Sequence, residues 1–162
     1  MERDQVDDHL DRWSRVMPDL DPEVEGPVTR MQLLVRHLRR VKQSTLAAHE
    51  LQTSEYETLH ALVGRGEPHQ ANPTELAAEL QLSPAAMTGR IDGLERRGLL
   101  HRLPSPDDRR RVVVRLSPAG HQAWRAAMDA MGDEEVRIFG ALDRTERRQL
   151  DDLLRRLVQA TR

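Results

Sequence analysis

Apolar residues recur at steps of three and four along most of the chain, which is the spacing of a helix with one buried face. The first such stripe joins Val6, Leu10 and Trp13, and prolines and aspartates at 18–22 interrupt it. Later stripes end near glycine or proline, as helices commonly do. The pattern predicts helices at about 4–17, 26–48, 54–63, 73–80, 85–97, 118–139 and 143–158.

Four of these helices begin with a capping signal. In two of them a short polar residue is followed three positions later by glutamate, the spacing of a capping box in which the glutamate reaches back to the cap. In three of them proline occupies the first helical position, where its missing N–H costs nothing. The four starts are Asn72-Pro73-Thr74-Glu75, Ser83-Pro84, Ser117-Pro118 and Asp143 to Glu146.

In one short segment the apolar residues recur at every second position instead of every third or fourth. Val112, Val114 and Leu116 alternate with Val113 and Arg115, which indicates a strand, and residues 100–103 supply its hairpin partner. The hairpin follows two short helices joined by a tight turn, the arrangement of a helix-turn-helix with a wing. The predicted fold is therefore mainly α (α+β): a winged helix-turn-helix with a two-stranded wing and a helical dimerisation region.

This reading divides the chain into three parts. Residues 1–20 form an N-terminal arm helix, residues 53–118 the winged helix, and residues 21–52 with 119–162 the dimerisation region. Hydrophobic residues make up 38% of the chain and charged residues 32%, so the terminal helices carry apolar stripes without a core of their own. Two-fold pairing would bury those stripes, and we expect a homodimer.

Composition excludes several classes of protein. Cysteine is absent, which rules out disulfides and thiolate chemistry. No apolar run is long enough to span a membrane, and the charged N-terminus does not resemble a secretory signal, so a cytoplasmic protein is expected. The seven scattered histidines show no close metal-ligand spacing, and no nucleophile elbow or phosphate loop is present. We expect that the protein is not an enzyme and has no cofactor and no metal site.

Charge is unevenly distributed along the chain. The net charge is −2, yet residues 89–115 hold eight arginines against four acids. A basic segment on a wing and a recognition helix favours DNA as the partner, although a winged helix that contacts protein instead of DNA remains an alternative.

The residues expected at DNA differ in role. Ser83 and nearby backbone amides suit a phosphate, Thr88 and Arg90 reach base edges, and small residues admit thymine methyls. Arginines at the hairpin tip suit the minor groove, and Asp108 is placed to pair with Arg110 and stabilise the wing. The candidate DNA contacts are Ser83, Ala85, Ala86, Thr88, Gly89, Arg90, Arg109, Arg110 and Arg111.

Asp108-x-Arg110 followed by Leu116-Ser117-Pro118-Ala119-Gly120 resembles the wing signature of the MarR family of winged-helix regulators, with Ser117 in place of the usual threonine. The stretch from Leu76 to Leu99 is similar to the helix-turn-helix of that family. The resemblance implies a homodimeric repressor that binds a pseudo-palindromic DNA operator.

The N-terminal arm with Trp13 resembles the urate-responsive branch of the same family. The resemblance implies a site for urate or a phenolic or carboxylate anion, formed by Trp13, Glu57, Arg90 and Arg102, where Glu57 replaces the aspartate of the branch. Glu57 would pair with an arginine while the site is empty. Other readings stay open: Trp13 as the core anchor of the arm, Glu57 as a surface residue, and Arg90 as a DNA contact.

Overall fold

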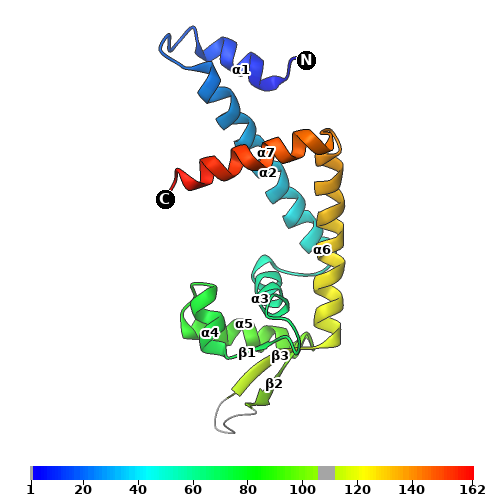
Figure 1. The fold of residues 1–162 in the computed structure, drawn as a ribbon. Helices are drawn as coiled ribbons and strands as arrows, with labels where there is room; N and C mark the ends of the chain where they lie inside the picture. Colours follow the sequence, from blue (N-terminus) through cyan, green and yellow to red (C-terminus); the bar gives the residue numbers. More distant parts are fainter. Residues whose placement is uncertain (1, 106–111) are drawn as a thin grey trace. The chain divides into compact units, whose positions relative to one another are not determined.

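The computed structural model describes residues 2–105 and 112–162, which form helices around a small antiparallel sheet (Figure 1). The chain divides into two compact units, Met1–Lys42 and Gln43–Arg162, each of which is described by itself. The elements are α1 (Gln5–Trp13), α2 (Pro22–Ala48), α3 (Thr53–Val63), β1 (Gln70–Ala71), α4 (Pro73–Glu79), α5 (Pro84–Arg96), β2 (Leu100–Pro104), β3 (Val112–Leu116), α6 (Pro118–Phe139) and α7 (Arg144–Gln159).

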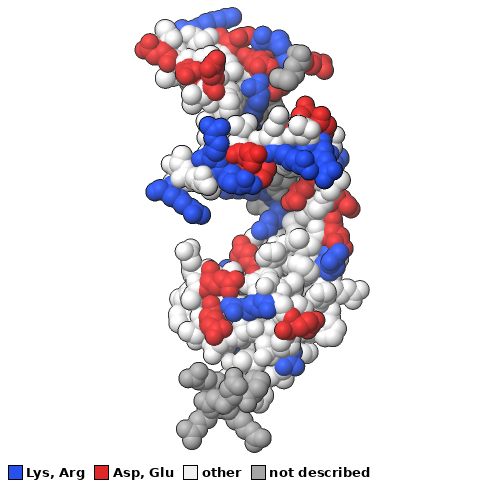
Figure 2. Space-filling model, in the orientation of Figure 1, with Lys and Arg blue, Asp and Glu red and all other residues white. Residues whose placement is uncertain are grey.

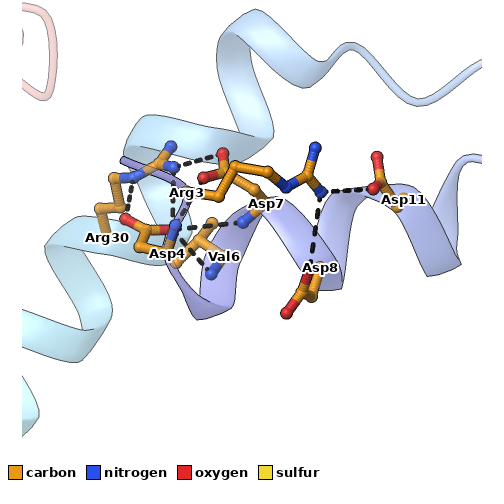
Figure 3. A network of polar contacts seen from close by, with 7 residues as sticks. All are labelled: Arg3, Asp4, Val6, Asp7, Asp8, Asp11 and Arg30. Carbon is orange, nitrogen blue, oxygen red and sulfur yellow. Dashed lines mark hydrogen bonds and ion pairs between the residues drawn. The ribbon is translucent and has the colours of Figure 1, made fainter. Parts of the chain in front are cut away.

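The first unit contains α1 and most of α2, and an ion-pair network joins the two helices (Figure 3). Asp4 caps α1 by accepting the N–H groups of Val6 and Asp7. The Arg30 guanidinium of α2 contacts the carboxylates of Asp4, at 2.9 Å, and Asp7, at 2.7 Å. Of the apolar stripe predicted for this segment, Val6 is buried, while Trp13 stays 44% exposed. The helix ends at Trp13, four residues earlier than the predicted end at Met17.

The network gives the arm an acid-sensitive contact. The Arg30 guanidinium holds the pKa of Asp4 below its ordinary 3.8, and the backbone N–H of Asp4, followed by Arg30, does the same for Asp7. Groups with a lowered pKa stabilise the folded state above their ordinary pKa, and this contribution disappears as the pH falls through the lowered value. We therefore expect docking of α1 to weaken below about pH 4.

Carboxyl titration by NMR measures this directly. In Arg30→Gln the pKa of Asp4 should return toward its ordinary value, whereas that of Asp7 should move less because its strongest partner is a backbone N–H. Equal pKa values for Asp4 in the wild type and the variant would contradict the role of Arg30.

The second unit contains the winged helix that the sequence predicts. β3 lies between β1 and β2, and both neighbours are antiparallel to it, with Leu100 opposite Leu116 and Gln70 opposite Arg115. The helix-turn-helix is α4 and α5, and Gly98, two residues after the end of α5, has a φ of 69°, the left-handed conformation typical of a glycine after a helix. The core residues that are fully enclosed include Leu59, Leu62, Leu76, Leu94, Leu100 and Val114.

The predicted caps are confirmed with one correction. Ser83, Ser117 and the pair Asp143–Glu146 cap α5, α6 and α7. Asn72 caps α4 by accepting the Thr74 N–H at 2.8 Å. Glu75 does not reach back to Asn72 among the described contacts, because its carboxylate lies 3.6 Å from the Arg65 guanidinium.

A tight corner joins the wing to α6. The Ser117 hydroxyl donates to the Gly98 carbonyl at 2.7 Å and accepts the Gly120 N–H at 2.9 Å. The Ser117 N–H donates to the Leu99 carbonyl. Gly120 is buried directly under that carbonyl, so the corner fixes the end of α5, the end of β3 and the start of α6 against one another.

The last helix is amphipathic but has no buried residue. Leucines line one face of α7, and arginines gather over it on the face that Figure 2 shows. Its apolar side chains remain exposed at Leu153 (53%), Leu157 (53%) and Val158 (57%). Within the described part of the chain, no helix combines the length and the apolar character needed to cross a membrane.

Candidate nucleic-acid interface and effector site

The outer face of α5 carries small and hydroxylic side chains. Ser83, Ala85, Ala86, Thr88 and Gly89 are all exposed. The Ser83 oxygen accepts the Ala86 N–H at 3.2 Å, and the Thr88 hydroxyl donates to the Pro84 carbonyl at 2.9 Å. The cap fixes the start of the helix, and the small side chains leave this face of α5 open to close approach by a partner.

Arg90 lies on the side of α5 that faces α3. Its Nη1 donates to the Ser54 carbonyl at 3.3 Å and lies 3.5 Å from the Glu57 carboxylate. The expected pairing of Glu57 with an arginine is therefore present, and Arg90 is its partner. Both contacts are long for a charge-assisted hydrogen bond, so a better acceptor could draw the Arg90 guanidinium away from α3.

Arg102 has a different environment. Its guanidinium contacts the carboxylates of Asp92 and Glu95 on α5, and its backbone N–H donates to Glu95 at 3.0 Å. The backbone N–H of Arg102 is the main cause that lowers the pKa of Glu95, and Asp92 is the main cause that raises the pKa of Arg102. These contacts attach β2, the first strand of the wing, to α5.

The four residues expected at the effector site are therefore only partly assembled. Glu57 and Arg90 are in contact, while Arg102 binds Asp92 and Glu95 and shares no described contact with either of them. Trp13 belongs to the first unit, where it lines a shallow hollow of about 340 Å³ with Arg12 and Val16.

The candidates at the tip of the wing, Asp108, Arg109, Arg110 and Arg111, lie outside the described residues. At the base of the wing, the Arg115 guanidinium donates to the Gln70 side-chain oxygen at 2.8 and 3.1 Å. This contact ties β3 to β1 and gives the wing a fixed base.

One part of the surface was missed from the sequence. Arg96 and Arg97, at the end of α5, line a cavity of about 430 Å³ together with the first turn of α3. Glu55 in that turn is buried and accepts from Arg97 at 2.6 Å. The helix carries two acids, Glu55 and Glu57, and the sequence gives no signal that Glu55 is the buried one that needs a cation against it.

Known proteins resemble this chain over the elements just described. The MarR family matches residues 51–112, which span the whole of α3 to β2 and the start of β3. The transcriptional regulator PecS of Dickeya dadantii is 29% identical over 94% of this chain and 92% of its own length. The chain is similar to the MarR family over its winged helix. The match to PecS covers the N-terminal arm as well as the winged helix.

Two further proteins share a shorter stretch or the fold alone. The transcriptional repressor MprA of Escherichia coli K12 is 33% identical over 57% of this chain and 52% of its own length. The YusO protein of Bacillus subtilis has the same fold, with a TM-score of 0.74 at 19% identity over 88% of this chain and 99% of that one. PecS is a transcriptional regulator and MprA is a transcriptional repressor.

Proposed function

We propose that the protein is a homodimeric transcriptional repressor that binds a pseudo-palindromic operator and is released by a small anionic ligand. The observation that carries the proposal is the exposed small-residue face of α5, capped at Ser83 and fixed to the wing through Arg102. In this arrangement α5 enters the major groove, and the arginine-rich wing follows the adjacent minor groove.

The proposed dimer uses residues 21–52 and 119–162. Support comes from α7, whose apolar face is exposed in one chain, and from Val136 and Phe139 near the end of α6, which are 74% and 41% exposed. Two-fold pairing would cover such faces and set two copies of α5 about one DNA turn apart.

The proposed effector is urate or a phenolic or carboxylate anion. Support comes from the long contact between Arg90 and Glu57, because an anion that accepts two hydrogen bonds from Arg90 would replace a weaker partner. Trp13 offers an exposed ring for stacking, and Arg102 would join only after leaving Asp92 and Glu95. Moving Arg90 would couple the ligand to α5, and couplings of this kind are typically about 1–3 kcal/mol.

The test is binding of the purified chain to its own upstream intergenic DNA, followed by fluorescence anisotropy at several salt concentrations, with and without urate. The logarithm of the binding constant should fall by roughly 0.9 per neutralised phosphate per decade of salt. Release by urate supports the effector, and binding that persists in urate points to another anion. Absence of salt-dependent binding to this and other promoter DNA would leave a helical protein-interaction module.

Replacing Arg110 by alanine tests the wing. We expect weaker binding to every DNA sequence and a salt slope reduced by about one, because the side chain is proposed to neutralise backbone charge beside the minor groove. The matched control is Arg3→Ala in the N-terminal arm, an exposed arginine paired with Asp11 at 2.5 Å. An unchanged slope for Arg110→Ala would contradict its role.

A further inference from the structure

A basic cavity lies between the first turn of α3 and the flank of α5, two helices that pack against each other (Figure 1). Its volume is about 430 Å³, and three arginines line it: Arg90 and Arg96 of α5 and Arg97 directly after that helix. The carboxylates among or beside them are Glu55 and Glu57, so the cavity keeps a net positive charge.

The carboxylate of Glu55 serves to hold Arg97 in place. Glu55 is buried, and the same Oε2 atom accepts the Gln52 N–H at 2.9 Å and Nη1 of Arg97 at 2.6 Å. Arg97 is thereby fixed at the rim of the cavity, with its other guanidinium N–H groups without a partner among the described contacts. Such a preorganised guanidinium loses little side-chain entropy when it binds an oxyanion.

Arg96 is the least committed of the three arginines. Its Nε donates to the Asp92 carbonyl at 3.3 Å, and no described contact uses its two terminal nitrogens. A guanidinium with free terminal N–H groups can make the two parallel hydrogen bonds that phosphates accept.

Two glycines leave the wall of the cavity bare. A Cβ at Gly89 or Gly93, one helical turn apart, would meet no atom within 4 Å. Glycine in a helix costs about 1 kcal/mol relative to alanine, and neither packing nor a positive φ calls for it at these two positions. Their effect is to let a group outside the chain approach the backbone of α5 closely.

We propose that this cavity binds a phosphate oxyanion, held by Arg96 and Arg97 with Glu55 as a positioning residue, and that the phosphate belongs to the DNA backbone. Gly89 carries the argument for DNA, because it lies both on the exposed face of α5 and in the cavity wall. A helix inserted in the major groove brings its flanks against the phosphates on either side. The inference rests on the proposed function and adds a contact that fixes the depth of α5 in the groove.

The test uses the full chain with two duplexes of equal length, one from its own upstream region and one of scrambled sequence. For Arg96→Gln and Arg97→Gln we expect the salt slope to fall by about one and the affinity to drop about five- to tenfold on both duplexes. Arg97→Lys keeps the charge and should keep the slope. Arg3→Gln in the N-terminal arm, an exposed arginine outside every proposed contact, is the control, and thermal melts verify that every variant is folded.

Gly93→Leu tests the cavity without changing charge. Its side chain enters open space, so folding should be unaffected while the salt slope falls as in the arginine variants. Glu55→Gln releases Arg97 and should lower affinity less than Arg97→Gln does. Unchanged slopes in Arg96→Gln, Arg97→Gln and Gly93→Leu would overturn the DNA contact.

Inorganic phosphate, titrated into the DNA-free protein by 31P NMR, separates the two sources of the oxyanion. Phosphate that binds the wild type but not Arg97→Gln, together with unchanged slopes on DNA, would overturn the DNA source and leave a site for a free anion. If the wild type binds no DNA, the proposed function fails, and the phosphate titration alone decides whether an oxyanion site exists. If the variants show no reduction in salt slope and the wild type binds no phosphate, the site itself is overturned.

Discussion

Replacing Gly120 by alanine is expected to be the most destabilising addition of one methyl group to the winged helix. A Cβ at this position would lie 2.0 Å from the Leu99 carbonyl oxygen and 2.9 Å from the Leu116 side chain. Both distances are below van der Waals contact, and the nearest atom is backbone that cannot rotate away. The corner around Ser117 would have to open, and the hydrogen bonds from Ser117 to Gly98 and Leu99 would lengthen.

Overpacking of a core typically costs about 1–3 kcal/mol, and a backbone clash places Gly120→Ala at the upper end. For a chain of this size, 3 kcal/mol lowers Tm by roughly 6–12 °C. Gly132→Ala on the same helix is the matched control: its Cβ meets nothing within 4 Å, so it should stabilise by about 0.5–1 kcal/mol. Thermal denaturation followed by circular dichroism compares the two, and similar Tm values would contradict the close approach at Gly120.

The fold was largely predictable because local signals and packing agree. Helix periods, caps such as Ser83 and Ser117, and the alternation around Val114 all lie where the structure has the corresponding elements. Glu75 shows the limit of such signals. A capping box describes only the local chain, and the Arg65 guanidinium from the preceding loop offers Glu75 a charged partner that the sequence spacing does not reveal.

The third strand could not be predicted for a related reason. β1 comprises only Gln70 and Ala71, too few residues to show a period of two. It forms because the chain reverses at His69, whose φ of 53° is left-handed, and because β3 offers an open edge opposite Arg115. Both causes are tertiary.

The sequence predicted individual residues of the candidate site better than it predicted which of them contact one another. Arg90 and Glu57 pair as expected, since α3 and α5 are neighbours in any winged helix of this order. Arg102 binds α5 instead, because Asp92 and Glu95 are three residues apart on one helix face and together surround a guanidinium. From the sequence, Arg96 and Arg97 were only part of the basic segment at 89–115. The cavity that they line depends on how closely α3 approaches α5.

The second large effect is expected on α7. The exposed side chains Leu153, Leu154, Leu157 and Val158 form one stripe on a helix with no buried residue of its own. The N-terminal end of α7 is attached to α6 by a hydrogen bond of 2.9 Å from the Arg147 Nε to the Phe139 carbonyl, so the stripe is presented by a fixed helix. In the proposed dimer this stripe is covered by a second copy.

We therefore expect the double variant Leu153→Glu/Leu157→Glu to abolish the dimer. Full burial of a leucine is worth about 1.5–3 kcal/mol, and two-fold symmetry changes four leucines at once. The dissociation constant of the dimer should therefore rise by on the order of 10⁴-fold or more. DNA affinity should fall with it, because a monomer presents a single α5 to a two-half operator. The control Gln149→Glu/Gln159→Glu adds the same charge outside the stripe. Sedimentation velocity and anisotropy on the same samples test this, and a double variant that stays dimeric would show that α7 is not the interface.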